Sequence, residues 1–473
     1  MPSAVQTLLL GAAVLLSAAG VRAQAPGDAA DVRIDSGIVR GRTGEGVTAF
    51  KGIPFAAPPV GPLRWRAPQP VAAWTGVHDA GVYGHDCMQL PFPSDAAPLG
   101  TAPAEDCLFA NVWRPTAPGR KLPVMVWIYG GGFVNGGGSP PTYTGAELAR
   151  QGIVVVSFNY RLGRFGAFGD PSLTAADPDR GRLVNYGLMD QLAALRWVKR
   201  NVAAFRGDPG NVTIVGESAG GMSVHALVTS PMGRGLFQRA VVESGGTASF
   251  GGKTVATAEA AGVAFAQSKG IQPGDPQAVA KLRALSADQV VDGLNLASRP
   301  AQGAATYSGP VVDGRIVVDP LDAYRADRFA AVPVMIGATS DDIGGASGPM
   351  ITGARDLAGL LAGKGVPVYY YRFGYVANSV RGPTTRGAAH ASDIPFFFNT
   401  AAIKYGAETT ATDRAAAKVI SGYLVNFVKN GDPNGSGLPK WRAYGADRSM
   451  MTLAPNGSAT AAPEAEPQPH GQP

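Results

Sequence analysis

Cysteine and charge are both scarce in this chain of 473 residues. Only two cysteines occur, Cys87 and Cys107, which are too few for a structural zinc site. Charged residues make up 16% of the chain and hydrophobic residues 45%, so a large core can form and extensive disorder is not expected. The net charge is +6, but Lys and Arg are scattered singly and never form a basic run. The composition therefore gives no indication of nucleic-acid binding.

Long apolar runs are missing as well. After residue 23, no segment has the roughly 18 apolar residues that a membrane-spanning helix needs. Residues 8–16 form a short apolar stretch. In the segment Val21-Arg22-Ala23 that follows, Val21 and Ala23 occupy the positions that a signal peptidase recognises before its cleavage site. We expect residues 1–23 to be a signal peptide and the mature protein to be periplasmic or secreted, with no integral membrane segment. A buried N-terminal helix is the alternative, because MPSAVQT lacks Lys and Arg.

The two cysteines agree with export. Cys87 and Cys107 flank a segment rich in Pro and Gly, and an oxidising compartment would allow them to close it as a loop. The alternative is a pair of free, buried thiols.

Strand and helix patterns alternate along most of the chain. Helical spacing covers residues 190–202 and 415–430, the latter ending at Gly431 as a C-cap. The apolar runs that predict buried strands are 122–129, 152–160, 211–215, 239–244, 332–338 and 367–373. This alternation predicts an α/β fold with a mostly parallel sheet and helices on both faces.

The two ends of the chain differ from this rhythm. Residues 31–55 predict a small antiparallel sheet whose strands are joined by Gly turns. The tail at 456–473 is rich in Ala, Pro and Glu and is expected to be disordered. We therefore expect one domain over residues 24–455.

The stretch NVTIVGESAGG, residues 211–221, places Ser218 between a predicted strand and a predicted helix. Gly216 and Gly220 have no Cβ, so the chain can reverse sharply and expose the serine Oγ at the edge of the sheet. The motif G-x-S-x-G alone is weak in a chain with 64 glycines. Its strand–turn–helix context favours a nucleophile over an ordinary turn.

A nucleophilic serine needs a base and an orienting acid. Of the five histidines, His390 follows both the serine and a credible acid and lies outside the tail that holds His470. His225 follows Ser218 on the same predicted helix and is expected to pack against the sheet. The acid is Asp341 or Asp342, which follow the predicted strand 332–338.

A glycine run supplies a candidate oxyanion hole. Gly130-Gly131-Gly132 directly follows the predicted strand 122–129, where its N–H groups can converge on an oxygen atom. The amide of Ala219 is the second expected donor. A flexible linker is the alternative, but linkers seldom follow a buried strand directly.

The chain resembles the type-B carboxylesterases from about residue 31 to residue 453. The stretches that carry the resemblance are GIPFAAPPVGPLRW (52–65), AEDCLFANVWRP (104–115), VWIYGGGF (126–133), FNYRLGRFG (158–166), the segment 185–221 that ends in GESAGG, and GDPN (431–434). The resemblance implies an α/β-hydrolase fold and hydrolysis of small-molecule carboxylic esters, without a metal or an organic cofactor.

The resemblance also implies roles for individual residues. It makes Ser218 the nucleophile and His390 the base, and it selects Asp342 over Asp341 as the acid. It supports a disulfide between Cys87 and Cys107. The remaining matches are the oxyanion donors Gly131, Gly132 and Ala219, and the positions near the triad, Glu217 and Ser244.

Two departures from the family pattern concern the acid. The family usually has Glu where this chain has Asp342, so the loop that carries Asp342 must come closer to His390. Only 48 residues separate Asp342 from His390, an interval shorter than is typical of the family. We expect a wide cleft above Ser218 as a result.

Two other activities remain open from the sequence. A hydrolase of amides or carbamates uses the same constellation, and some relatives are non-catalytic binding proteins that lose the nucleophile. This chain keeps every part of the motif, which favours ester hydrolysis. The sequence does not indicate the oligomeric state.

Overall fold

A computed structural model describes residues 28–92, 97–119, 121–176, 179–298 and 305–464. The expected signal peptide, residues 1–23, lies outside the described residues. Within the described ranges, no helix has both the length and the apolar character required to cross a membrane.

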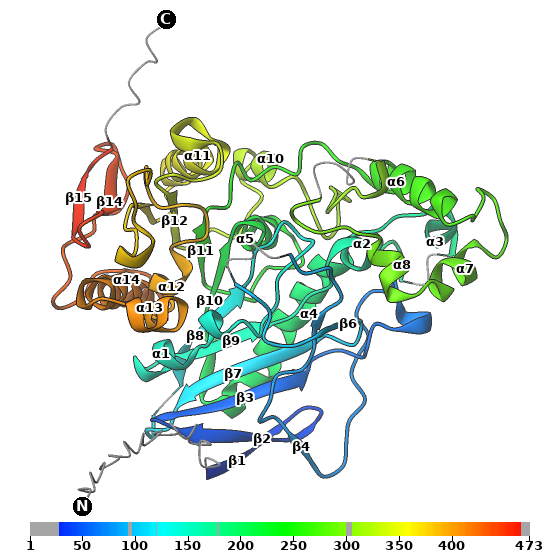
Figure 1. The fold of residues 1–473 in the computed structure, drawn as a ribbon, viewed down its shortest axis with the longest axis horizontal. Coiled ribbons are helices and arrows are strands. Elements are labelled where there is room, and N and C mark those ends of the chain that lie inside the picture. The colour runs from blue at the N-terminus through cyan, green and yellow to red at the C-terminus, as the bar shows by residue number, and fades with distance from the viewer. Residues whose placement is uncertain (1–27, 93–96, 120, 177–178, 299–304, 465–473) are drawn as a thin grey trace, which may run out of the picture.

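One large sheet organises the part of the chain that the structure describes (Figure 1). Its strands follow the order β1-β2-β3-β7-β9-β8-β10-β11-β12-β13-β14-β15, with β4 paired to β2, while β5 and β6 form a separate pair. The strands are β1 (Asp28–Ile34), β2 (Gly37–Gly44), β3 (Val47–Pro54), β4 (Val77–Asp79), β5 (Asp86–Cys87), β6 (Pro103–Ala104), β7 (Phe109–Pro115), β8 (Leu122–Ile128), β9 (Val154–Phe158), β10 (Gly207–Glu217), β11 (Arg239–Glu243), β12 (Val334–Thr339), β13 (Val368–Phe373), β14 (Ser449–Leu453) and β15 (Ala459–Pro463).

The centre of this sheet is parallel and its margins are antiparallel. Strands β9, β8, β10, β11, β12, β13 and β14 pair in parallel. Strands β1, β2, β3 and β7 continue the sheet in antiparallel pairs, which confirms the small N-terminal sheet. All six strands predicted from apolar runs are present, because strands such as β9 and β12 are buried along their whole length.

Helices cover both sides of the sheet, as the alternating pattern predicts. In Figure 1, α1 and α12–α14 lie to the left of the central strands, whereas α4 and α5 lie to the right. The helices are α1 (Ala146–Arg150), α2 (Gly163–Gly166), α3 (Pro171–Ala176), α4 (Tyr186–Asn201), α5 (Ala219–Thr229), α6 (Val255–Ser268), α7 (Ala278–Ala284), α8 (Ala287–Val291), α10 (Pro320–Arg325), α11 (Pro349–Gly363), α12 (Ile394–Phe397), α13 (Ala401–Tyr405) and α14 (Ala411–Asn430).

Local signals define the ends of α14. At its N-terminus, Thr410 and Asp413 form a capping box. At its C-terminus, Gly431 adopts φ 76°, a left-handed conformation that costs glycine little, so the predicted C-cap is confirmed.

The expectation of a disordered tail from residue 456 is wrong for its first part. Residues 459–463 form β15, which pairs with β14 along the edge of the sheet. Beyond β15, a carboxylate oxygen of Glu464 lies 3.1 Å from the hydroxyl of Tyr370. Composition did not predict this strand because pairing at a sheet edge depends on backbone groups rather than on apolar side chains. Residues 465–473 lie outside the described residues.

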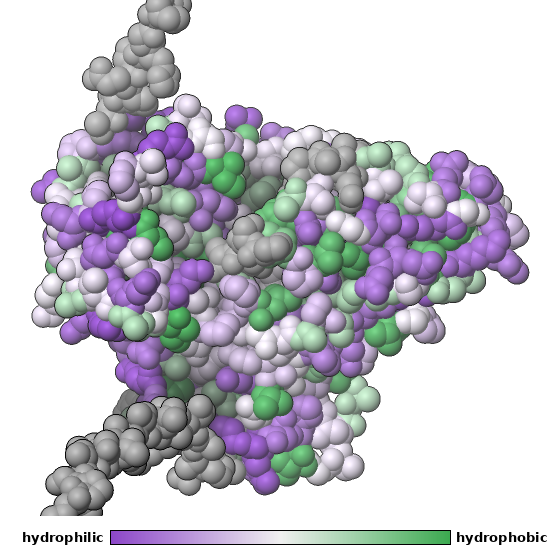
Figure 2. Space-filling model, viewed as in Figure 1, coloured by the Kyte–Doolittle hydropathy of each residue, from purple (hydrophilic) through white to green (hydrophobic). Residues whose placement is uncertain are grey.

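The surface shown in Figure 2 carries hydrophobic residues in small, separate patches. Hydrophilic residues gather on the lobe that holds α6 and α7, at the right of the view. Scattered patches of this kind are normal for the surface of a globular protein.

Parallel pairing brings three loops to one edge of the sheet. The glycine run follows β8, Ser218 follows β10, and Asp341 and Asp342 follow β12. Because parallel strands end on the same side, the residues after them meet in the crevice where open α/β sheets bind ligands.

Candidate active site

Ser218 occupies the corner between β10 and α5. Its backbone adopts φ 55° and ψ −120°, a strained conformation that directs the side chain away from both elements. A Cβ at Gly216 would lie 2.4 Å from the carbonyl oxygen of Gly220, and one at Gly220 would lie 2.0 Å from that of Ile128. Both positions therefore require glycine, which is the physical basis of the G-x-S-x-G pattern here. Ser218 itself is half-buried.

His390 lies between Ser218 and Asp342. Its Nε2 is 2.9 Å from Ser218 Oγ, and its Nδ1 is 2.7 Å from Asp342 Oδ1. The adjacent carboxylate, Asp341, instead lies 3.5 Å from the Arg386 guanidinium. The structure thus brings together the serine, the histidine and the second of the two candidate acids.

Asp342 is held by hydrogen bonds on both carboxylate oxygens. The hydroxyls of Ser244 and Thr339 donate to Oδ2 at 2.7 and 2.9 Å, and the amide of Ile343 donates to Oδ1 at 2.7 Å. Burial opposes ionisation, but the hydrogen bond from His390 and these other donors lower the pKa of Asp342 to about 2. The carboxylate is therefore ionised at neutral pH and oriented toward His390.

A backbone bridge compensates for the short acid. Asp341 pairs with Ala389 in an isolated parallel bridge, and the amide of Asp341 donates to the Ala388 carbonyl at 2.9 Å. The amide of Ala388 in turn donates to Ser340 Oγ at 2.9 Å. These contacts draw the two loops together, so an aspartate reaches His390 although it is one methylene shorter than glutamate.

The glycine turn after β8 lies against Ser218. A Cβ on Gly130 would come within 2.9 Å of the Ser218 Cβ, and Gly131 and Gly132 adopt φ 96° and 63°. A Cβ on Gly131 would lie 2.3 Å from the Asn135 carbonyl oxygen. The turn therefore depends on glycine both for its conformation and for its close approach to Ser218.

A cavity of about 330 Å³ opens over these groups. Its lining includes Ser218 and His390 as well as Phe92 and Ala97. Cys87 and Cys107 form a disulfide, so the predicted pairing is confirmed. Phe92 and Ala97 belong to the loop that this disulfide closes. The disulfide thus fixes the ends of the loop from which Phe92 and Ala97 line the cavity.

Comparison with known proteins places this arrangement in a family. The model of the carboxylesterase family matches residues 28–348 and 347–468. The chain belongs to the carboxylesterase family. A carboxylesterase structure from Geobacillus stearothermophilus is 32% identical and superposes with a TM-score of 0.78, covering 92% of this chain and 98% of that one. The predicted α/β-hydrolase fold is confirmed.

Three relatives show how the similarity is distributed. Para-nitrobenzyl esterase of Bacillus subtilis is 42% identical and fumonisin B1 esterase of Sphingopyxis macrogoltabida 40% identical, each over 65% of this chain. The match spans only 61% and 55% of the length of those two relatives. A medium-chain fatty acyl-CoA hydrolase precursor of Anas platyrhynchos is 33% identical, covering 94% of this chain and 92% of its own length.

Several buried carboxyl groups lie behind His390. Burial raises the pKa of Glu217 to about 8 and that of Asp393 to about 7, and it raises the pKa of Glu243 well above its ordinary value. Oε1 of Glu217 is 3.3 Å from His390 Nε2. Burial alone would lower the pKa of His390, but Glu217, Asp342 and Asp393 together raise it. The site thus favours a positive charge on the imidazole.

Two members of this acidic group were not predicted from the sequence. Glu243 ends β11 directly before Ser244, and Asp393 lies three residues after His390. Neither oxygen of Glu243 has a hydrogen-bond partner among the described residues. Acidic residues in otherwise apolar segments, VVES and DIPFFF, were the available signal.

His225 lies in the packed interior of the fold. It is buried on α5, with Nδ1 2.9 Å from the Tyr324 hydroxyl, and burial lowers its pKa to about 3. It therefore remains neutral and contributes to packing.

Proposed function

We propose that this protein is a carboxylic ester hydrolase in which Ser218, His390 and Asp342 act as a catalytic triad. The observation that carries the proposal is the position of His390, whose two ring nitrogens lie 2.9 Å from Ser218 Oγ and 2.7 Å from Asp342 Oδ1. A serine hydroxyl is a weak nucleophile until a base within hydrogen-bond reach accepts its proton. The family of the chain supports the same chemistry.

In the first half of the reaction, Ser218 Oγ attacks the ester carbonyl carbon while His390 Nε2 accepts the hydroxyl proton. Asp342 holds the imidazole in the productive tautomer and stabilises the imidazolium. The amides of Gly131, Gly132 and Ala219 donate to the oxyanion. When the tetrahedral intermediate collapses, His390 returns the proton to the departing alcohol and an acyl-serine remains.

In the second half, a water molecule attacks the acyl-serine and His390 accepts its proton. The intermediate then releases the carboxylic acid, and Ser218 recovers its hydrogen. Glu217 and Ser244 contact the triad residues rather than the substrate. Glu217 lies next to the His390 imidazole, and Ser244 donates a hydrogen bond to Asp342.

We propose uncharged small-molecule esters as substrates. The relatives are named for para-nitrobenzyl esters, fumonisin B1 and fatty acyl-CoA, so the family name alone does not select an acyl group. The cavity lining is largely apolar and includes Tyr143, Leu296 and Ile394. Such a lining favours acyl and aryl groups over charged ones.

A panel of p-nitrophenyl esters of graded acyl length tests the proposal. Wild-type protein should release p-nitrophenol, and Ser218→Ala, checked for folding by circular dichroism, should not. Amide and carbamate analogues of the best ester separate the related hydrolases, which would cleave them at comparable rates. Turnover that Ser218→Ala leaves unchanged would contradict the proposal, and a well-folded wild type that hydrolyses none of the esters would favour a binding protein on this scaffold.

We also propose that the protein is exported, to the periplasm or the medium. Residues 1–23 read as a signal peptide, and a disulfide is stable in an oxidising compartment. The relative from Anas platyrhynchos is described as a precursor. N-terminal sequencing of the mature protein should start at Gln24; a protein that retains Met1 in the cytoplasm would refute export.

A further inference from the structure

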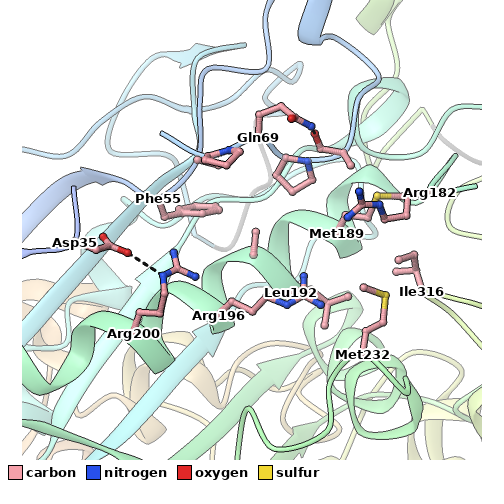
Figure 3. A pocket seen from close by; sticks show the side chains of 15 residues that line it. Asp35, Phe55, Gln69, Arg182, Met189, Leu192, Arg196, Arg200, Met232 and Ile316 are labelled. Carbon is pink, nitrogen blue, oxygen red and sulfur yellow. Dashed lines mark hydrogen bonds and ion pairs between the residues drawn. The ribbon is translucent and has the colours of Figure 1, made fainter. Parts of the chain in front are cut away.

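A second hollow, of about 440 Å³, lies between α4 and the segment that follows β3 (Figure 3). It shares no lining residue with the cavity over Ser218. Met232, on its rim, follows the C-terminal end of α5, whereas Ser218 caps the opposite end of that helix. At about 1.5 Å per residue, the 11 residues of α5 separate the two places by roughly 16 Å. The hollow is therefore distinct from the candidate active site.

The floor of this hollow is apolar. Phe55, Met189, Leu192 and Ile316 line it and are themselves at most 5% exposed. Its volume falls within the range of roughly 300 to 1,000 Å³ that is usual for small-molecule sites. An alkyl or aryl group could therefore leave water by entering it.

Three arginines border this apolar floor, and two of them have partners. Arg200 Nε donates to Asp35 Oδ2 at 2.8 Å, the contact drawn in Figure 3. Arg182 Nε donates to the backbone carbonyl of Asp179 at 3.0 Å, and the Asp179 carboxylate pairs with Arg66 at 2.8 Å. Asp35, which lines the hollow, and Asp179 are thus already paired with Arg200 and Arg66.

Arg196 is different. It extends from α4 toward the hollow, is half-buried, and has no hydrogen bond or ion pair with any of the described residues. Burial, together with the positive charges of Arg182 and Arg200, lowers its pKa. An arginine nevertheless keeps its charge in proteins, so this guanidinium stands partly desolvated without a counter-ion.

We propose that this hollow binds an amphipathic organic carboxylate, with its anionic group on Arg196 and its alkyl or aryl body on the apolar floor. A guanidinium matches a carboxylate with two parallel hydrogen bonds, and a bound anion removes the repulsion among the three arginines. One anionic group suffices, because Arg200 is already paired with Asp35. The acids released by ester hydrolysis belong to this class, but the site does not depend on the catalytic assignment.

Isothermal titration calorimetry with octanoate, below its micellar concentration, tests this site on the full chain. Wild-type protein should bind octanoate, and Arg196→Gln should weaken the affinity of one site by about tenfold or more, the loss expected for one charge-assisted pair. Arg442→Gln is the matched control, because the Arg442 side chain is 73% exposed and lies outside the hollow. Octanoate held in the catalytic cavity would remain in Arg196→Gln and so would not mimic the effect.

Further measurements keep the test decisive. Ala193→Trp, which adds a bulky side chain to the lining of the hollow, should abolish the same site even if Arg196→Gln folds poorly. Octylammonium should not bind there. Octanoate should raise the thermal unfolding temperature of wild type and of Arg442→Gln by the same amount, and that of Arg196→Gln by less. Identical octanoate isotherms for wild type, Arg196→Gln and Ala193→Trp would overturn the proposal, as would equal binding of octylammonium.

Discussion

The imidazole of His390 and the carboxylate of Asp342 lie 2.7 Å apart although 48 residues separate them in the chain. Their loops are joined by the backbone bridge between Asp341 and Ala389, which places Asp342 and His390 on adjacent segments. The neighbouring Asp341 takes part in that bridge through its backbone, while its side chain faces Arg386. Asp342 thus contacts His390 through its side chain, whereas Asp341 joins the two loops through its backbone. Substituting each side chain should therefore have different effects on activity.

Replacing members of the proposed triad should affect turnover and not folding. We expect Ser218→Ala and His390→Ala to lower kcat by roughly 10⁴-fold or more, and Asp342→Asn by a comparable factor, because the imidazole loses its orienting carboxylate. Asp341→Asn is the control and should lose less than about tenfold, since only its backbone joins the loops. Kinetics with p-nitrophenyl butyrate measure all four variants. A larger loss for Asp341→Asn would assign the acid to Asp341.

Activity should depend on pH through His390. The histidine must be neutral to accept the Ser218 proton, so kcat/KM should rise with pH through the pKa of His390 and level off above it. Because the surrounding carboxylates raise that pKa, the rise should lie above the ordinary value of 6.5. Asp342→Asn removes one of these charges and should move the rise to lower pH. Profiles of wild type, Asp342→Asn and Asp341→Asn would disagree with this account if all three rose at the same pH.

The disulfide should stabilise both the fold and one wall of the cavity. Closing a loop across 20 residues contributes about 3 kcal/mol to stability in the chain-entropy description. We expect the double variant Cys87→Ser/Cys107→Ser to unfold at lower temperature and to show a higher KM, because Phe92 and Ala97 lie within the loop. Thermal melts with and without reductant provide the control, since reductant should affect wild type alone. An unchanged melting temperature in the double variant would mean that the loop is held by its other contacts.

Choline esters should not be preferred over uncharged esters of similar size. The segment between Cys87 and Cys107 contains no Trp, the residue on which cholinesterases rest a quaternary ammonium group. Butyrylcholine and 3,3-dimethylbutyl butyrate form a matched pair for this comparison. A kcat/KM for butyrylcholine well above that for the neutral ester would contradict the prediction.

Esters of tertiary alcohols should be accepted. The sequence Gly130-Gly131-Gly132 resembles the subset of the family that hydrolyses them, and the short interval between Asp342 and His390 predicts a wide cleft. We expect measurable hydrolysis of tert-butyl acetate, and a Gly131→Ala variant should lose it, because a Cβ there would meet the Asn135 carbonyl at 2.3 Å. Release of tert-butanol, followed by gas chromatography with ethyl acetate as the reference substrate, measures both. A wild type that hydrolyses ethyl acetate but not tert-butyl acetate would refute this specificity.

The sequence determined the features that depend on neighbouring residues. The corner at Ser218 was predictable because the steric demands on Gly216 and Gly220 follow from a strand running directly into a helix. The strands were predictable because continuous apolar runs mark strands buried on both faces. The pairing of Cys87 with Cys107 needed no choice, since the chain has no other cysteine.

Tertiary structure decided what depends on distant segments. The position of Asp341 and Asp342 after a predicted strand left both open as the acid, and the family resemblance selected Asp342; the structure shows Asp342 Oδ1 2.7 Å from His390 and Asp341 in the backbone bridge to Ala389. From the sequence, Arg196 is an ordinary residue on the surface of a helix; in the folded chain the segment after β3 lies over α4, and Arg196 borders a hollow with no partner among the described residues. β15 likewise exists because the edge of β14 offers it a hydrogen-bond ladder. Local sequence patterns do not specify contacts between segments that are far apart in the chain, so these features could not be predicted without the tertiary structure.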